Sequence, residues 1–229
     1  MKKTFAALAL AAALIPFTGA HAATISYGDA TELKKTNWTS TLNFSKFDTS
    51  LGTLNSIRFD LSGLVRGTGK AESDDEGATT VSLTLGSILK LSRPDGTELV
   101  LSNPVFSQVF EFSAGDGDID FGGTSGGTTG LVNASAAEFF VSTSSSDFAL
   151  FSALGGGSIG LGLKATGASS ATGAGNLSTG FQTFAKGTVN VTYDYTPFAA
   201  EVPEPASMAL ILGGLGLLGL SRRRFGNKA

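Results

Sequence analysis

The stretch TVSLTLGSILKLS, residues 80–92, decides the fold class of this chain of 229 residues. Its apolar side chains recur at every second position over most of its length, and the positions between are mainly Ser, Thr, Gly and Lys. The apolar positions are Val81, Leu83, Leu85, Leu89 and Leu91. A period of two places successive side chains on opposite faces of a strand. The stretch therefore predicts a β-strand with one face in a core and the other in water.

The same alternation recurs along the chain. It is clear at 57–61, 159–163 and 189–195, and weaker at 38–44, 98–101, 105–112, 137–141 and 148–154. Between two of these strands, RPDG at 93–96 places a proline and a glycine where a tight turn needs a preset φ and a positive φ. We therefore expect about nine or ten strands, with a hairpin that joins residues 81–92 to 97–102.

The composition favours an all-β protein. The 31 glycines suit short strands with many turns, and the 17 phenylalanines can fill the space between two sheets. We expect one antiparallel β-sandwich over residues 23–200, with a jelly-roll or a Greek-key topology and loops at 122–130 and 166–176. The chain has no cysteine, so this domain must be held by its core without disulfides.

Residues 1–22 are typical of a secretory signal peptide. Lys2 and Lys3 precede an apolar run from Phe5 to Ile15, and the small residues Ala20 and Ala22 mark a cleavage region. The run is shorter than the roughly 20 residues that a membrane-spanning helix needs. We expect a signal helix that is removed after Ala22, with export of the rest of the chain.

Charge and residue types exclude several function classes. Residues 24–200 carry 10 Lys and Arg against 17 Asp and Glu, and a surface of this sign repels the phosphates of nucleic acids. The single histidine, His21, lies in the signal peptide. The mature chain therefore cannot form a Ser-His-Asp or Cys-His site, or a zinc site with thiolate or imidazole ligands. We expect a protein that is not an enzyme and that needs no cofactor.

The best candidate for a metal site is the loop GDGDIDFGG, residues 115–123. Asp116, Asp118 and Asp120 recur at alternate positions, as carboxylate ligands do in calcium loops. The loop departs from the EF-hand pattern, because Phe121 stands where that pattern has glycine. The alternative is an acidic turn in water. The acidic run at 74–76 could likewise hold a divalent ion or contact a cationic partner, and its alternative is a solvated hairpin tip.

Residue types also leave carbohydrate chemistry open. Glycosidases use two carboxyl groups at a separation that the fold sets, which sequence spacing does not show. Exposed aromatic rings can stack on sugars, and the large amphipathic rings here are Tyr27, Trp38, Tyr193 and Tyr195. Tyr193 and Tyr195 share the apolar face of the 189–195 strand, so we expect both in the core.

The C-terminal segment combines three features of a processing signal. EVPEPA at 201–206 holds two prolines that keep the backbone extended, the form in which a protease cleft pairs with a substrate. Residues 206–220 form an apolar run of about 22 Å as a helix, which is short for a membrane span. Arg222, Arg223 and Arg224 follow, and such residues stay on the cytoplasmic side. We expect a short transmembrane helix that holds the domain outside until processing.

These features make residues 201–229 similar to the PEP-CTERM sorting signal of Gram-negative bacteria, with Val202, Pro203, Glu204 and Pro205 as its core. The resemblance implies that the chain is a substrate of an exosortase, a membrane-embedded cysteine protease-transpeptidase associated with extracellular polysaccharide production. Residues 24–196 also resemble the choice-of-anchor E domain, through the stretches at 37–63, 91–99, 116–126 and 175–181. That family brings no known catalytic residue or ligand.

Together these features predict an exported protein that is anchored transiently in the membrane, processed by an exosortase and then placed at the cell surface or outside the cell. We expect a structural or interaction component of an extracellular matrix, associated with exopolysaccharide or a biofilm. The alternative is a calcium-dependent carbohydrate-binding module that uses Asp116, Asp118 and Asp120.

Overall fold

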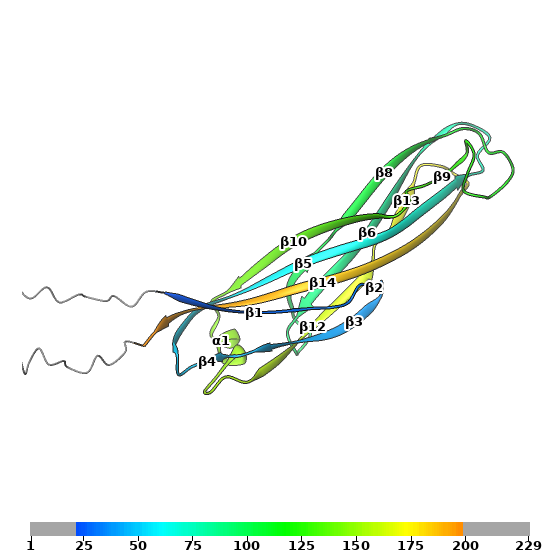
Figure 1. Cartoon of the computed structure of the whole chain (residues 1–229). Helices are drawn as coiled ribbons and strands as arrows, with labels where there is room; N and C mark the ends of the chain where they lie inside the picture. Colours follow the sequence, from blue (N-terminus) through cyan, green and yellow to red (C-terminus); the bar gives the residue numbers. More distant parts are fainter. Residues whose placement is uncertain (1–21, 199–229) are drawn as a thin grey trace, which may run out of the picture. The chain divides into compact units, whose positions relative to one another are not determined.

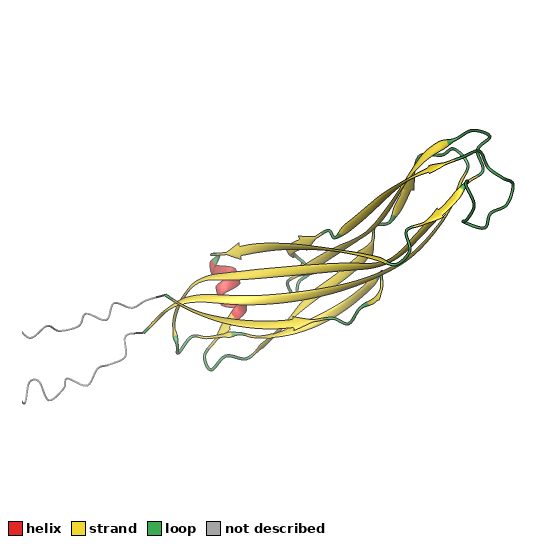
Figure 2. Ribbon diagram, turned by 45° about the horizontal axis from the view of Figure 1, so that its top comes forward, coloured by secondary structure: helices red, strands yellow, loops and turns green. Residues whose placement is uncertain are grey.

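Two packed β-sheets account for most of the structure (Figures 1 and 2). The computed structural model describes residues 22–198, so the predicted signal helix and the C-terminal helix lie outside the described residues. The elements in chain order are β1 (Ala23–Ala30), β2 (Lys34–Lys35), β3 (Trp38–Ser45), β4 (Phe47–Asp48), β5 (Gly52–Ser73), β6 (Thr79–Ser92), β7 (Glu98–Ser102), β8 (Val105–Phe112), β9 (Gly126–Thr128), β10 (Val132–Ser142), α1 (Ser145–Phe151), β11 (Ser152–Ala153), β12 (Ser158–Gly167), β13 (Ser170–Thr172) and β14 (Leu177–Pro197).

The first sheet has the order β1-β14-β5-β10, with β2 beside β14 and β9 beside β5. The second has the order β13-β6-β12-β3, with β7 and β8 also paired to β6. All pairs in both sheets are antiparallel, and the only parallel pair among the described strands is the short one of β4 with β11. The prediction of an all-β antiparallel fold is confirmed, and the arrangement is consistent with a β-sandwich.

The long strands β5 and β14 lie at the centre of the first sheet (Figure 1). They pair from Leu177 opposite Ser73 to Pro197 opposite Gly52, with one irregularity at Asp194 and Tyr195. A strand of 22 residues spans about 70 Å at the usual rise per residue. We call the end where β5 finishes and β14 begins the distal end, and the opposite end the terminal end.

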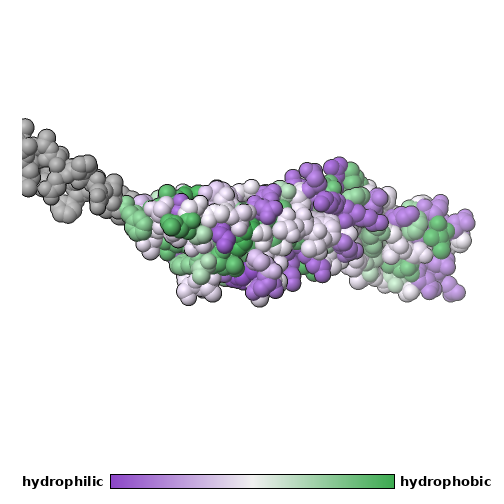
Figure 3. Space-filling model, turned by 90° about the horizontal axis from the view of Figure 1, so that it is seen from below, coloured by the Kyte–Doolittle hydropathy of each residue, from purple (hydrophilic) through white to green (hydrophobic). Residues whose placement is uncertain are grey.

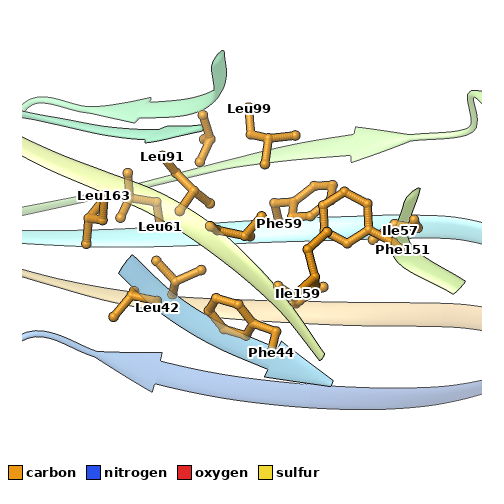
Figure 4. Packing of buried hydrophobic residues seen from close by; sticks show 14 of the residues in the cluster. Leu42, Phe44, Ile57, Phe59, Leu61, Leu91, Leu99, Phe151, Ile159 and Leu163 are labelled. Carbon is orange, nitrogen blue, oxygen red and sulfur yellow. The ribbon is translucent and has the colours of Figure 1, made fainter. Parts of the chain in front are cut away.

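The main core lies between the sheets toward the terminal end. Nineteen buried apolar residues form it, contributed by both sheets and by α1; Figure 4 shows Phe59, Phe151 and Leu91 among those that meet there. Phe59 and Phe151 pack edge to face with ring centroids 5.0 Å apart. The alternating face of the 80–92 stretch is buried as predicted, because Val81, Leu83, Leu85, Leu89 and Leu91 are all at most 1% exposed.

A second, smaller group of buried apolar residues, the distal cluster, lies toward the distal end. Its fully buried members are Ala71, Val81, Leu83 and Phe112. Partly buried residues from β8, β13 and β14, such as Phe110 and Phe181, pack against them. The distal cluster therefore holds the ends of β5, β6, β8 and β14 together with far less apolar material than the main core.

Between the two groups lies a waist that is poor in large side chains, formed by residues 63–69 of β5 and the strand positions that face them. A Cβ on Gly63 would lie 2.8 Å from Ser102 Oγ and 3.0 Å from Leu89 Cδ1. The absence of a side chain there lets the two sheets approach closely. Polar residues fill much of the space: Ser102 Oγ donates to the Ala136 carbonyl at 2.9 Å, and Ser169 and Thr183 hydroxyls lie 2.9 Å apart.

The RPDG turn joins β6 to β7 as predicted. Gly96 N–H donates to the Arg93 carbonyl at 2.9 Å, and Gly96 has a φ of 87° that suits glycine. Asp95 Oδ1 accepts from the backbone N–H of Thr97 at 2.9 Å. The register places Leu91 opposite Val100, so both strands present apolar residues to the core.

One strand prediction is wrong: residues 148–154 do not form an extended strand. The helix α1 occupies most of this segment, and only Ser152 and Ala153 pair as β11. Phe148 and Phe151, three residues apart, both contact the main core, which is a helical spacing. Ser144 caps the helix, since its Oγ accepts from the Asp147 N–H at 3.2 Å.

Candidate functional site

The described strands next in sequence to both predicted processing points, β1 and β14, meet at the terminal end of the first sheet. β1 begins at Ala23, directly after the predicted cleavage position Ala22, and Ala23 lies opposite Tyr195 of β14. β14 ends at Pro197, just ahead of the EVPEPA segment at 201–206. Removal of the signal therefore leaves the new N-terminus beside the strand that leads into the sorting signal. The cleavage residue Ala20, the motif residues 202–205 and the arginines 222–224 lie outside the described residues.

The three aspartates of the calcium hypothesis lie on the exposed loop between β8 and β9. Asp116 Oδ1 accepts from the Asp118 N–H at 3.0 Å, and Asp120 Oδ1 accepts from the Gly122 N–H at 2.7 Å. Each of these carboxylates thus supports a local turn of the loop. Within residues 22–198, no three His, Cys, Asp or Glu side chains are grouped so that they could hold a metal ion. The geometry gives the calcium hypothesis no support and favours the acidic-turn alternative.

The acidic run at 74–76 lies at the tip of the distal end. Asp75 accepts from the N–H groups of Gly175 and Asn176, both at 2.9 Å, and its own carbonyl accepts from Gly115 N–H. It therefore ties three loops together, while Glu76 is exposed. The role visible for Asp75 is structural.

Glu72 at the end of β5 is a buried carboxylate that sequence reasoning missed. It is 1% exposed, and its Oε1 accepts from Ser125 Oγ at 2.7 Å. Its Oε2 is buried without a hydrogen-bond partner. A Cβ on Gly126 would lie 2.1 Å from Oε2, so glycine leaves the space that this carboxylate occupies. The alternation of β5 predicts an outward side chain here, and only the loop that folds over it makes the position buried.

The ion pair of the partly exposed Arg93 with the buried Asp147 fixes α1 to the β6–β7 hairpin. Arg93 Nε and Nη2 donate to the two Asp147 oxygens at 2.7 and 2.8 Å, and Ser142 Oγ donates to Asp147 as well. The hydrogen bonds from Arg93 hold the pKa of Asp147 below its ordinary value, against the opposing effect of burial. The pair has every oxygen engaged, as a structural ion pair does, and it opens onto no cavity.

The tyrosine prediction is confirmed for Tyr193. Its ring is fully buried, and its hydroxyl donates to the Ser45 carbonyl at 2.9 Å. Burial raises the pKa of Tyr193 well above the usual tyrosine value. Tyr195 is half-buried against the same core and its ring centroid lies 5.1 Å from that of Phe47. The Tyr193 ring is therefore not free to stack on a sugar.

Two shallow surface hollows lie on the outer face of the first sheet. One of about 300 Å³ is lined by Leu64, Arg66, Leu131 and Asn133, residues of β5, β10 and the loop before β10. Another of about 140 Å³ surrounds Phe139, where the Arg58 guanidinium lies 3.8 Å from the ring centroid. Arg58 also donates from Nε to Asp60 at 2.8 Å. These hollows hold no group of converging acid, base and nucleophile.

Apolar surface collects on β10, which sequence reasoning assigned to an ordinary strand. Phe139, Phe140 and Val141 are 57%, 37% and 43% exposed. The face of the domain seen in Figure 3 also has larger apolar areas toward the left, at the terminal end, and more hydrophilic areas toward the right. Three apolar residues in a row within a strand, FFV, were the signal that could have revealed an exposed edge.

Comparison with known proteins identifies the C-terminal segment. Residues 201–224 match the PEP-CTERM protein-sorting motif. This motif supports an exosortase-sorted extracellular protein, and it implies export, membrane association and sorting to the cell surface. No helix among residues 22–198 has the length and apolar character needed to cross a bilayer. No curated protein matches the chain.

Solved structures give only distant similarities. The STIV MCP structure has a TM-score of 0.24 and 13% identity, over 77% of this chain and 50% of that chain. The VP2 subviral particle of infectious bursal disease virus has a TM-score of 0.21 and 14% identity, over 79% of this chain and 37% of that chain. The chain thus spans half or less of these proteins. Scores this low support no argument about fold or function. The chain carries the sorting motif of exosortase substrates after its last described strand.

Proposed function

We propose that the mature protein is a non-enzymatic component of the cell surface or extracellular matrix, delivered by an exosortase and associated with exopolysaccharide. The observation that carries the proposal is the sorting motif at 201–224, which begins shortly after β14 ends at Pro197. An exosortase that cuts within the motif would release or transfer the folded domain without disturbing β14. The association with exopolysaccharide follows from the resemblance of the motif alone.

The domain itself supports a structural or interaction role. The main core and the distal cluster lie between its sheets, and the two hollows on its outer face are shallow. Some of its charged groups make structural contacts, as Arg93 with Asp147 and Asp75 with the loops of the distal end show. The resemblance of residues 24–196 to the choice-of-anchor E domain agrees with this role, since that family presents domains on various anchors.

The intact mass of the mature protein from the native host tests the sorting step. We expect a species that begins at Ala23 and lacks the residues after the Pro203–Pro205 region. In a host strain without the exosortase, the mass of the protein should include the uncleaved tail, and the protein should stay in the membrane fraction. A wild-type species that still contains Arg222 to Ala229 would show that the tail is a plain anchor.

A second measurement tests the matrix role. The purified domain should sediment with exopolysaccharide extracted from the host, and it should release no soluble sugar from it. Substitution of Arg66 by Ala in the larger outer hollow, with Lys164→Ala on the other sheet as the matched control, locates the contact. Sugar release by the wild-type domain would contradict the proposal of a non-enzymatic protein.

A further inference from the structure

Strand β10 is an edge strand whose apolar residues are exposed on both faces. Phe139, Phe140 and Val141 follow one another, so their side chains alternate between the two faces of the sheet. All three are more than a third exposed. Phe140 covers Phe59 with its ring stacked at 6.3 Å, yet its outer side remains open.

The backbone of β10 also presents free hydrogen-bonding groups. Among the described strands, β10 pairs only with β5. The backbone carbonyl of Gly69 in β5 accepts from the Thr129 N–H, on the side of β5 where β9 lies. Gly187 of β14 lies opposite Gly63 of β5, and its backbone groups bond to Thr31, on the side of β14 away from β5. Odd-numbered residues of β5 therefore direct their backbone groups toward β10, where they meet even-numbered residues such as Phe140, opposite Phe59. The N–H and C=O groups of Phe139 and Val141 consequently point away from the sheet.

The edge lacks the features that keep edge strands apart. β10 reads VNASAAEFFVS, with no lysine, no proline and a single charged residue, Glu138. Natural proteins protect edges with such residues or by covering them. The opposite edge of the same sheet is tied down, since Asp29 Oδ2 of β1 accepts from the Asn43 N–H of β3 at 3.1 Å. Of the two edges of this sheet, the β10 edge is therefore the one that is open to pairing with another strand.

We propose that β10 pairs antiparallel with β10 of a second copy of this chain, about a two-fold axis at Phe140. In this register Phe139 lies opposite the partner copy's Val141, and Phe140 lies opposite its own counterpart. Every residue of the exposed apolar triplet then meets an apolar residue, and the outward backbone groups of Phe139 and Val141 find partners. The inference goes beyond the proposed function and does not depend on it.

The distribution of charge favours a second copy as the occupant. Of the 17 acidic residues between 24 and 200, eight lie at the distal end, where Lys70 is the single basic residue. These eight are Glu72, Asp74, Asp75, Glu76, Glu111, Asp116, Asp118 and Asp120. The remaining nine acidic and nine basic residues balance over the rest of the domain, which includes β10. Antiparallel pairing also places the two acidic distal ends at opposite ends of the dimer, where their repulsion is weakest.

Single cysteines test the register, because the native chain has none. At a two-fold axis, a non-hydrogen-bonded pair has Cα atoms about 4.5 Å apart, within the range that a disulfide spans. We expect Phe140→Cys in the domain of residues 23–198 to form a disulfide-linked dimer on mild oxidation. Ser135→Cys is the matched control, since its two copies would lie about 33 Å apart in this register.

Sedimentation equilibrium tests the interface without a disulfide, and it keeps the proposal testable if Phe140→Cys fails to fold. The wild-type domain should show a concentration-dependent dimer. Val141→Lys should weaken the dimerisation affinity by at least about tenfold, because the two-fold axis places a lysine from each copy in the interface. Thr188→Lys adds the same charge at an exposed position in the middle of the sheet and should leave the dimer intact. A wild-type domain that stays monomeric, a dimer unaffected by Val141→Lys, or equal cross-linking through both cysteines would overturn the proposal.

Discussion

The main core and the distal cluster hold the same long strands by different means. The main core has nineteen buried apolar residues, including four phenylalanines and the buried Tyr193, whereas the distal cluster has four. At the distal end, hydrogen bonds replace much of the packing: Ser125 donates to Glu72, and Asp75 accepts from two loop N–H groups. A net hydrogen bond contributes about 1 kcal/mol, less than a buried phenylalanine. The distal end should therefore open at a lower free energy than the terminal end.

Truncation in the main core should have the largest effect. Phe59→Ala removes a fully buried ring that packs against Phe151 and Phe140, and we expect a loss of about 4 kcal/mol in the free energy of unfolding. Urea denaturation followed by circular dichroism measures it. Leu154→Ala, at a residue 83% exposed, is the control and should change stability by less than about 0.5 kcal/mol. A loss similar to that of the control would mean that the main core is not the stabilising unit.

Breaking the ion pair that covers the main core should come next. Asp147→Asn leaves Arg93 with a neutral partner, and we expect a loss of about 3 kcal/mol at neutral pH. Because folding lowers the pKa of Asp147, its contribution is present at neutral pH and is lost as the pH falls below the ordinary aspartate range. The difference between wild type and variant, measured by urea denaturation at several pH values, should shrink on acidification. Asp118→Asn, on the exposed loop, is the control and should change stability at neutral pH by less than about 0.5 kcal/mol.

The equivalent truncation in the distal cluster should cost less and act locally. Phe112→Ala removes a ring that is 4% exposed, but the loops around it can close over part of the space, so we expect about 2 kcal/mol. Amide hydrogen exchange should accelerate in β8, β9 and the start of β14 while the amides near Phe59 keep their protection. Ile119→Ala, an exposed apolar residue at the same end, is the control. Uniform acceleration throughout the domain would show that the two regions unfold as one.

The smallest effect should come from the loop that covers Glu72. Lys70 Nζ lies 3.8 Å from the centroid of the Phe121 ring, and such an exposed contact contributes about 0.5 to 1 kcal/mol. Lys70→Met keeps the aliphatic stem but removes the charge. We expect faster exchange of the amides in residues 113–125 with little change in global stability. Lys186→Met, on the same face of the first sheet, should leave that loop unchanged.

Sequence periodicity found most strands of the domain but not their lengths. Two-residue alternation located the strands at 57–61 and 189–195, whereas the structure extends them to Gly52–Ser73 and Leu177–Pro197. Gly63, Gly67 and Gly69 interrupt the apolar pattern of β5, and Gly187 does so in β14. A side chain at Gly63 or Gly187 would meet the opposite sheet, and one at Gly67 or Gly69 would meet β14 of the same sheet. The helix α1 was missed because seven residues give too short a window to separate helical from strand periodicity.

The sequence by itself determined the sorting signal and the fold class. The Val-Pro-Glu-Pro core, the apolar run and the arginines follow one another in the sequence, so the sorting motif can be recognised without the folded structure. The alternation of apolar and polar residues is a local consequence of strand geometry. Only the tertiary structure decided that Glu72 is buried, that Asp116, Asp118 and Asp120 are not grouped so that they could hold a metal ion, and that β10 has an open edge. Each of these depends on which distant segments become neighbours. Burial and pairing are properties of the contact between strands, and no single stretch of the chain encodes them.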